Sequence, residues 1–413
     1  MNILLINHYA GSPAHGMEFR PYYMAREWMR LGHRVEIVAC SHSHVRAQQP
    51  DMAAQTERVQ QIDGITYRWL QAPPYRGNGV GRVVNIATFL GRLWSRAARI
   101  VRDLQPDLVI ASSTYPMDTW LARHFAGLAR CPWIYEVHDL WPLSLTEVGG
   151  MSPLHPFALL CGWAERSAYR HADSVVSMLP QVHEHMAARG LDLKRLHIVP
   201  NGVALDAWEL EPEPLRSDVQ QAVDHAKAQG RAVVGYAGSM GLPNALDALI
   251  DAAALLQNQA VEFILVGDGH ERDRLVQRVR QEGLSRVRFL QPIPKPQIPS
   301  LLSQIDVAYI GWQRVPLYRF GIAPNKLMDY MMAGCVVLHS VEAGNDPVAE
   351  AGCGLTVPPM DPPAIARGLQ QLLRLPPHQR QAMCQAGRAH VRAHHVYEVL
   401  AQRFLAARPT MND

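Results

Sequence analysis

The chain has 413 residues, of which 48% are hydrophobic and 19% are charged, and its formal net charge is +3. This length exceeds a single compact core and predicts two or three domains, while so small a net charge argues against a nucleic-acid-binding protein. The six cysteines form no Cys-x-x-Cys pair, which indicates reduced thiols in a cytoplasmic protein rather than disulfides or a zinc site. Because the sequence has no long apolar run, we expect neither a signal peptide nor a membrane-spanning helix.

Short apolar runs alternate with helical patterns along the first half of the chain. Residues 3–6 are predicted to be a buried parallel strand, a helical pattern covers residues 17–31, and residues 34–40 (RVEIVAC) are the next strand candidate. Three further strand candidates follow at residues 107–111, 133–137 and 174–177. This alternation is typical of a doubly wound α/β sheet.

A second domain is predicted to begin near residue 201. Pro200-Asn201-Gly202 is a strong turn signal, and an acidic, proline-bearing stretch follows at residues 209–218. The alternation then restarts, with strand candidates at residues 232–238, 262–269, 287–291, 305–311 and 354–359. We therefore predict two Rossmann-like domains, residues 1–200 and 201–385, that face each other across a cleft and bind ligands at the carboxyl ends of their strands.

One helical segment, residues 79–104, combines basic and apolar side chains. Five arginines lie among its valines, leucines and aromatic residues: Arg82, Arg92, Arg96, Arg99 and Arg102. Two interpretations stay open. The segment is either a surface helix packed on the sheet or a basic amphipathic face that touches an anionic membrane.

The loop after the first strand contains glycines but no dinucleotide-binding fingerprint. Gly11 and Gly16 do not fit the spacing G-x-G-x-x-G, which disfavours a nicotinamide-dependent oxidoreductase. A glycine just before a helix can still present backbone N–H groups to a phosphate, and Arg20 lies one turn further on. The loop predicts an anion contact near Gly16, with a plain turn and a solvated arginine as the alternative.

Polar residues follow the strand candidate at residues 133–137. His138 and Asp139 lie at the carboxyl edge of the predicted sheet, where α/β proteins place their chemistry. His138 can donate a hydrogen bond to a substrate hydroxyl or contact a developing charge. The pair His42 and His44 has no third ligand nearby, so no metal site is predicted there.

Two glycine-containing loops and one lysine mark the second domain. The loops contain Gly238 and Ser239 after its first strand, and Gly267, Asp268 and Gly269 after the next. Parallel strands bring such loops to one edge of the sheet, and glycines permit close approach of a ligand. Lys326, beside Asn325, stands where a helix begins, although a helix N-terminus prefers acidic side chains. An anion brought in from outside would explain this lysine.

Five segments occur in the order of a known family: GSPAHGMEFRPYYMAREWMRLGHRVEIVA, YEVHDLWP, HIVPNGV, VGDG and APNKLMDYMMAGCVV. Together they resemble GT-B glycosyltransferases of family 4, especially the bacterial subgroup that builds O-antigen, capsule or exopolysaccharide and includes N-acetyl-L-fucosamine transferases. The resemblance covers nearly the whole chain and implies a retaining transfer from a nucleotide sugar without metal ion or cofactor. It also implies that residues 1–200 hold the acceptor, residues 201–385 hold the nucleotide, and residues 386–413 form a helix that crosses back to the first domain.

The resemblance further implies roles for single residues. His138, with Asp139 beside it, approaches the donor sugar as the catalytic candidate, and Gly16 approaches the diphosphate and the acceptor. The candidate donor-binding residues are Gly16, Arg20, Gly238, Ser239, Gly267, Asp268, Gly269, Asn325, Lys326 and Asp329. Glu18 and Glu147 are the acceptor-binding candidates.

The chain departs from the family pattern at two places. Tyr318 and Lys326 occupy positions where many members have two glutamates, and Ser239 and Asn244 occupy positions where many have an arginine and a lysine. We hypothesise that Lys326 neutralises the diphosphate in place of the missing cations. Asp329 is then a candidate for ribose binding.

The sequence therefore predicts a glycosyltransferase whose donor is a nucleotide sugar, with UDP as the favoured nucleotide and an N-acetylated amino sugar among the candidates. The acceptor implied is a lipid-linked saccharide at the cytoplasmic membrane face, with peripheral membrane contact and no nucleic-acid partner. Two alternatives stay open: a nucleotide-sugar 2-epimerase of the same fold, and an inactive GT-B subunit that binds a partner.

Overall fold

The computed structural model describes residues 1–77 and 79–409, which form two compact units. The first unit comprises Met1–Asn201 and the chain from Tyr397 onward, and the second comprises Gly202–Val396. The sequence placed the first boundary one residue earlier and the return of the chain at residue 386. The structure places this return at Tyr397, because helix α14 (Pro377–His394) packs on α11 (Asn325–Ala333) within the second unit.

The first unit is built on an eight-stranded sheet with the order β3-β4-β2-β1-β5-β6-β7-β8. Its strands are β1 (Asn2–Ile6), β2 (Arg34–Cys40), β3 (Glu57–Ile62), β4 (Ile65–Leu70), β5 (Leu108–Ala111), β6 (Trp133–Val137), β7 (Ser174–Ser177) and β8 (Leu196–Ile198). Neighbouring strands are parallel except β3 and β4, which form an antiparallel hairpin. This hairpin was not predicted, because the sequence of β3 (ERVQQI) is mostly polar.

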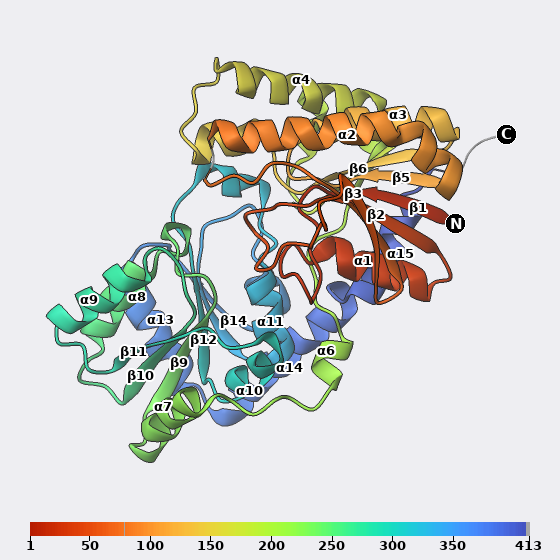
Figure 1. Cartoon of the computed structure of the whole chain (residues 1–413). Helices are drawn as coiled ribbons and strands as arrows, with labels where there is room; N and C mark the ends of the chain where they lie inside the picture. Colours follow the sequence, from red (N-terminus) through yellow and green to blue (C-terminus); the bar gives the residue numbers. More distant parts are fainter. Residues whose placement is uncertain (78, 410–413) are drawn as a thin grey trace. The chain divides into compact units, whose positions relative to one another are not determined.

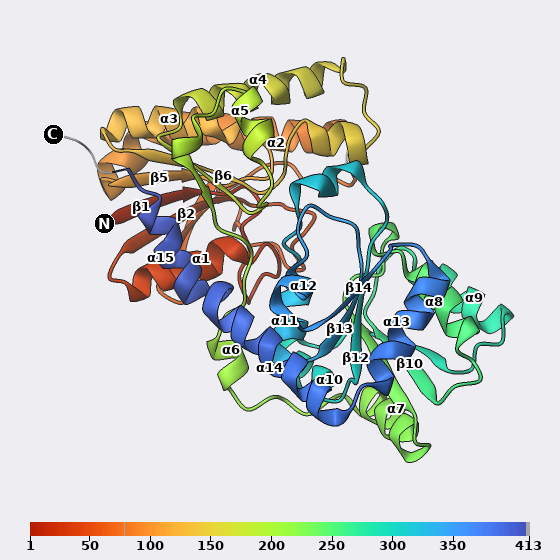
Figure 2. The same ribbon diagram turned by 180° about the vertical axis from the view of Figure 1, so that it is seen from behind.

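Helices cover both faces of this sheet (Figures 1 and 2). Helices α1 (Arg20–Arg30) and α15 (Tyr397–Ala406) pack together on one face. On the other face, α2 (Val80–Leu104), α3 (Asp118–Ala129) and α4 (Pro156–His171) form a layer, with α5 (His183–Ala188) beside α4. Every residue from Ile3 to Ile6 in β1 is at most 1% exposed, which explains the uninterrupted apolar sequence of this strand.

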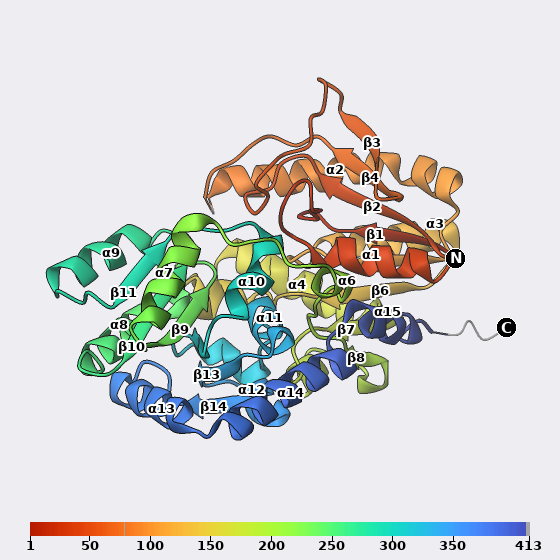
Figure 3. The same ribbon diagram turned by 90° about the horizontal axis from the view of Figure 1, so that it is seen from below.

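The second unit contains a six-stranded parallel sheet with the order β11-β10-β9-β12-β13-β14. Its strands are β9 (Ala232–Ala237), β10 (Val261–Val266), β11 (Val287–Leu290), β12 (Val307–Gly311), β13 (Val336–Ser340) and β14 (Gly354–Val357). Its remaining helices are α6 (Asp206–Glu209), α7 (Ser217–Ala228), α8 (Leu246–Leu255), α9 (Arg272–Gln281), α10 (Ile298–Leu302), α12 (Pro347–Ala351) and α13 (Pro362–Arg374). Helices α8, α9 and α13 lie on one face, and α7, α10 and α11 lie on the other (Figure 3). The strand order reverses beside β1 in the first sheet and beside β9 in the second, and such switch points are where doubly wound sheets bind ligands.

The arginines of α2 do not form a free basic face. Arg92 donates from Nη1 to the carbonyl oxygen of Gln71 at 2.6 Å, while Arg96 and Arg99 both pair with Glu57 of β3. The helix therefore packs on the sheet, as the first interpretation states, and these three arginines are engaged within the protein. Within residues 1–77 and 79–409, no helix is both long enough and apolar enough to cross a bilayer.

Candidate active site

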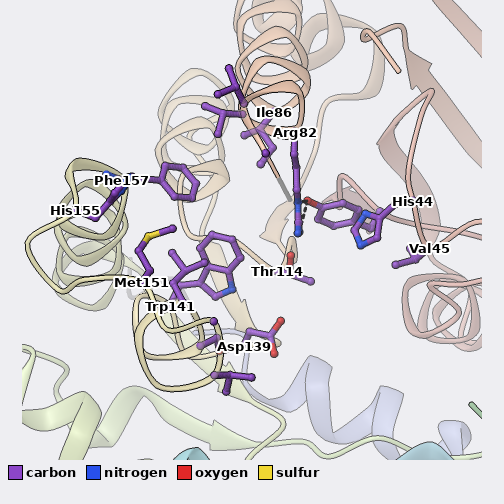
Figure 4. Close-up of a pocket in the computed structure, with 18 of the residues that line it drawn as sticks. His44, Val45, Arg82, Ile86, Thr114, Asp139, Trp141, Met151, His155 and Phe157 are labelled. Atoms are coloured by element: carbon purple, nitrogen blue, oxygen red, sulfur yellow. Dashed lines mark hydrogen bonds between the residues drawn. The ribbon is translucent and has the colours of Figure 1, made fainter. Parts of the chain in front are cut away.

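A pocket of about 760 Å³ lies at the carboxyl edge of the first sheet, near the switch point between β1 and β5. The loops that follow strands of the sheet, the start of α2 and the start of α4 form its walls (Figure 4). Its polar side chains include Tyr9, Glu18, His44, Arg82, Thr114 and Asp139. Its apolar side chains include Val80, Val83, Ile86, Trp141, Leu145, Val148, Met151 and Phe157. The pocket therefore combines charged groups with a large apolar wall, which suits an amphipathic ligand.

Arg82 is held at the pocket wall by Tyr9. Its Nε and Nη2 atoms donate to the Tyr9 hydroxyl at 3.1 and 2.9 Å, and its guanidinium carbon lies 5.4 Å from the centre of the tyrosine ring. Burial raises the pKa of Tyr9, so the hydroxyl stays protonated while it accepts from the guanidinium. Nearby, His44 Nδ1 lies 2.7 Å from the Tyr75 hydroxyl oxygen. In the described part of the chain, no group of three or more His, Cys, Asp or Glu side chains could hold a metal ion.

His138 belongs to a buried hydrogen-bond network. Its Nε2 atom lies 2.9 Å from Ser112 Oγ and 3.2 Å from Glu136 Oε2, and Ser112 Oγ donates to the same carboxylate oxygen at 2.6 Å. Burial alone would lower the pKa of His138, but the Glu136 carboxylate outweighs burial and raises it. His138 therefore holds a proton more readily than a free histidine and is fixed in orientation.

Arg20 has a structural role. Its side chain is 1% exposed, and the Glu136 carboxylate accepts from its Nε at 2.9 Å and pairs with its Nη2 at 2.8 Å. Its Nη1 donates to the carbonyl oxygen of Pro200 at 2.6 Å, and its Nη2 donates to that of Val199 at 2.9 Å. These partners engage its N–H groups inside the first unit, and a contact of Arg20 with the donor stays a prediction.

Gly16 closes a turn and uses its own N–H group there. The Gly16 N–H donates to the Ser12 carbonyl oxygen at 2.8 Å, and the Ser12 N–H donates to the Gly16 carbonyl oxygen at 3.1 Å. The φ angle of Gly16 is +90°, in the region that favours glycine. The Gly16 N–H is therefore already used within the turn, and an anion contact elsewhere near Gly16 stays a prediction. The turn also delays the predicted helix, which begins at Arg20.

The acidic candidates are divided between the pocket and its surroundings. Glu18, predicted to bind the acceptor, and Asp139, predicted to be catalytic, both line the pocket. Glu147 is not among the described residues that line it, although its neighbours Leu145 and Val148 are. The structure thus brings two of the three carboxylates together.

The glycine loops of the second unit pack on one another. A Cβ atom at Gly267 would lie 1.9 Å from the Gly238 carbonyl oxygen, and one at Gly269 would lie 2.5 Å from the Met240 carbonyl oxygen. The Met240 N–H donates to the Asp268 carbonyl oxygen at 2.8 Å. These glycines are thus required for contact between two loops, and their contact with a donor stays a prediction.

Gly267→Ala is expected to lower the free energy of unfolding by about 3 kcal/mol. The φ angle of +152° and the clash with Gly238 both oppose a side chain at this position. Gly283→Ala is the matched control, because its φ is also positive at +65° but nothing lies within 4 Å of the added Cβ; it should cost only about 1 kcal/mol. Urea unfolding measures the stability of both variants. Equal losses of stability would contradict the conclusion that the loop contact requires a glycine at position 267.

Lys326, in the first turn of α11, reaches the loop that follows β9. Its Nζ atom lies 2.5 Å from Asn244 Oδ1 and 2.9 Å from the Tyr236 hydroxyl oxygen, and 4.7 Å from the centre of the Tyr236 ring. A Cβ atom on Gly238 would lie 3.4 Å from the same nitrogen. Burial lowers the pKa of Lys326 to about 8, because the ammonium has lost much of its hydration. The amine thus lies beside Asn244, one of the two positions where the family resemblance implied a missing cation.

The remaining donor-binding candidates lie after β9 and β10 and in α11. Ser239 and Asp268 are exposed after β9 and β10, and Asn325 is exposed at the first position of α11. Asp329 is partly buried; burial raises its pKa to about 6, and the charge of Lys295 opposes this rise. Its role in ribose binding stays a prediction.

Several residues of these sites were not predicted. Tyr9 and Thr114 end polar runs that follow apolar strands, so their positions at the sheet edge carried a usable signal. Arg82 was assigned to a basic helix, because its direction depends on packing that the sequence does not show. Tyr236 lies within an apolar strand, and nothing in its surroundings marked it as a partner of Lys326.

Two domain families match most of the chain. The glycosyl transferase 4-like domain matches residues 15–202, and the glycosyl transferases group 1 domain matches residues 231–375. WbjE of Pseudomonas aeruginosa, named as a probable glycosyltransferase, is 24% identical over 305 residues, which are 72% of each chain. WcaI of Escherichia coli (strain K12), named provisionally as a colanic acid biosynthesis glycosyl transferase, is 23% identical over 248 residues, 59% of each chain. The solved structure of HepE from Anabaena in complex with UDP and glucose matches with a TM-score of 0.66 at 18% identity, over 98% of each chain.

Two Rossmann-like units and the two matched domains define a glycosyltransferase of the GT-B fold, which confirms the predicted fold class. More narrowly, the chain belongs to glycosyltransferase family 4.

Proposed function

We propose that this glycosyltransferase moves a sugar from a UDP-sugar to a lipid-linked saccharide during synthesis of a cell-surface polysaccharide. The transfer retains the configuration of the sugar and uses neither a metal ion nor a cofactor. The names of two similar proteins support the donor and the type of product: HepE is solved with UDP and glucose, and WcaI is named for colanic acid biosynthesis. An N-acetylated amino sugar is one candidate for the transferred group. The proposed place of action is the cytoplasm, at the inner face of the membrane.

The position of Lys326 carries this proposal. A departing nucleoside diphosphate gains negative charge, which the enzyme must stabilise. Lys326 holds a desolvated ammonium beside the loop after β9 and in the first turn of the nine-residue helix α11. A diphosphate at this point would meet both the lysine and the N–H groups at the start of the helix.

The pocket of the first unit supports an acceptor of mixed polarity. Glu18 and Asp139 can accept hydrogen bonds from sugar hydroxyls, and Arg82 can pair with a phosphate. The apolar wall, with Val83 and Phe157, suits a hydrocarbon chain. A saccharide joined to a lipid through a phosphate has all three features. In this scheme its hydroxyl oxygen bonds to the anomeric carbon of the donor sugar from the side on which the nucleotide leaves. The bond from that carbon to the diphosphate breaks, the hydroxyl proton passes to the departing diphosphate, and His138 donates a hydrogen bond to the sugar.

A ligand screen and a transfer assay test the function together. UDP is expected to raise the melting temperature more than GDP does, because binding stabilises the folded state. Labelled UDP-sugars should then pass their label to a lipid-linked saccharide. Conversion of the donor without transfer would favour the 2-epimerase, and absence of any nucleotide binding would favour the inactive subunit.

The affinity for UDP is expected to fall about tenfold between pH 7 and pH 9. Because burial lowers the pKa of Lys326 to about 8, its ammonium is mostly present at pH 7 and mostly lost at pH 9, and only the charged form attracts the diphosphate. Lys326→Arg keeps its charge over this range and should remove the fall in affinity. Any change of affinity with pH that remains in this variant is then caused by titration of the ligand. Titration calorimetry at stepped pH measures both proteins, and identical slopes would contradict the role of Lys326.

A further inference from the structure

The outward side of the layer formed by α2, α3 and α4 carries large exposed apolar side chains. Trp163 and Leu159 of α4 are 63% and 56% exposed, and Leu160, Leu154 and Val80 are exposed as well. Figure 1 shows the three helices side by side on one face of the first sheet. Extended apolar patches are uncommon on soluble monomers and usually mark a contact surface.

Ring contacts join the three helices at this surface. Trp94 of α2 stacks on His124 of α3, with ring centres 4.0 Å apart and an angle of 10° between the planes. Trp120 of α3 lies 4.9 Å from Trp163 of α4, measured between ring centres. The aromatic groups therefore belong to one continuous surface, here called the aromatic face and formed by Trp94, Trp120, Leu159, Leu160 and Trp163.

The charges around the aromatic face are almost all positive. On α4, Leu159, Trp163, Arg166 and Arg170 are exposed and recur every three or four residues, so they share one side of the helix. Among the exposed charged residues of α2, α3 and α4, Arg99 pairs with Glu57 and Arg102 pairs with Asp103, and the other three are Arg123, Arg166 and Arg170. The other acidic side chains of these helices are buried. A surface of this composition complements negative charge.

The aromatic face continues toward the apolar wall of the pocket. Val80 and Val83 of α2, and Val148, are exposed and also line the pocket. Phe157, which lies three residues before the exposed Leu160 and therefore on the same side of α4, points into the pocket in Figure 4. An apolar path therefore connects the pocket with the outer surface.

We propose that the aromatic face docks on an anionic lipid bilayer. Leu159, Leu160 and Trp163 then enter the interfacial region, where tryptophan is favoured, and Arg166 and Arg170 contact lipid phosphates. A second copy of this chain is a poorer occupant, because two such faces would bring like charges together.

This docking deepens the proposed function and rests on it in one respect, the lipid-linked acceptor. With the aromatic face on the bilayer, the hydrocarbon chain of the acceptor leaves the pocket past Val80 and Val83 and stays among the membrane lipids. The saccharide reaches Glu18 and Asp139 while its lipid remains in the membrane. The enzyme thus acts on its acceptor without extracting it, which avoids exposing the chain to water.

Vesicle flotation of the full-length chain tests the docking. The vesicles contain phosphatidylethanolamine and phosphatidylglycerol at about 7:3, so that they carry negative charge. Wild-type protein should float, and the double change Leu159→Ser/Trp163→Ser should weaken binding about tenfold or more. Arg166→Glu/Arg170→Glu should remove the preference for anionic over neutral vesicles. Leu255→Ser is the matched control, because Leu255 is 59% exposed on α8 of the second unit and should float as the wild type does.

Two further measurements separate the possible outcomes. Brominated lipids should quench the fluorescence of Trp163, and Trp163→Phe should remove that part of the quenching. A thermal shift with UDP, measured on the same variants, should be unchanged. Wild-type protein that fails to float but binds UDP would overturn the docking alone, and protein that floats but binds no nucleotide would overturn the proposed function alone. A dimer that Leu159→Ser/Trp163→Ser dissociates, without flotation, would assign the aromatic face to a second copy and overturn the docking.

Discussion

Lys326→Ala is expected to weaken UDP binding by about 10- to 100-fold and to reduce sugar transfer at least as much. A hydrogen bond to a charged group contributes about 1.5–3 kcal/mol, and about 1.4 kcal/mol corresponds to a factor of ten. Asn244 and Tyr236 already hold the Lys326 amine in place, so little side-chain entropy is lost when a diphosphate binds. Titration calorimetry and initial rates at varied donor concentration measure the two effects.

Two control variants make this result specific. Lys326→Arg should keep most of the affinity, because it keeps the positive charge. Lys227→Ala removes an exposed lysine of α7 and should bind UDP as the wild type does. The melting temperature of Lys326→Ala should change little, because burial disfavours the charged amine in the folded chain. Unchanged donor kinetics in a folded Lys326→Ala protein would rule out this donor site.

The fold could be predicted where single segments carry a strong apolar signal. The short apolar run from Ile3 to Ile6 favours a strand buried on both faces. Strand β3 lies at the edge of its sheet and is mostly polar, so its sequence lacks that signal. Its partner β4 (ITYRWL) is largely buried and does alternate, so this strand could have been predicted. The side of α2 that packs on the sheet could not be predicted, because it depends on ion pairs with another element. Arg96 and Arg99 pair with Glu57 of β3.

The candidate site could be predicted only in part, because its contacts join distant positions. Lys326 and Asn244 are 82 residues apart, and only the family resemblance related them before the structure did. The partner of Arg20, Glu136, is 116 residues away, and no local pattern indicates it. A glycine before a helix gives the same sequence pattern whether the N–H groups of the loop are available to an anion or are used within the loop. At Gly16 the N–H group is used within a turn.

Arg20→Met is expected to lower the free energy of unfolding of the first unit by about 3–5 kcal/mol, as measured in urea. The change removes a cation that is 1% exposed and leaves the Glu136 carboxylate buried beside Ser112 and His138. Val199 and Pro200 also lose the donors to their carbonyl oxygens. The control is Arg403→Met, which removes an exposed arginine of α15 in the same unit and should cost less than about 0.5 kcal/mol.

A double-mutant cycle with Glu136 identifies the cause of this loss. If the unpaired carboxylate dominates, Glu136→Gln in the Arg20→Met background should restore part of the stability, because it removes the buried charge, whereas the same change in the wild type should destabilise the protein. The pKa of His138 supplies a second readout. The charge of Arg20 lowers it and that of Glu136 raises it, so Arg20→Met should raise the pKa of His138 and Glu136→Gln should lower it, as nuclear magnetic resonance titration can show. The alternative outcome is that the stability losses of Arg20→Met and Glu136→Gln are additive and the pKa of His138 does not change. Arg20 would then stabilise the unit through the carbonyl oxygens of Val199 and Pro200 and would not affect the histidine.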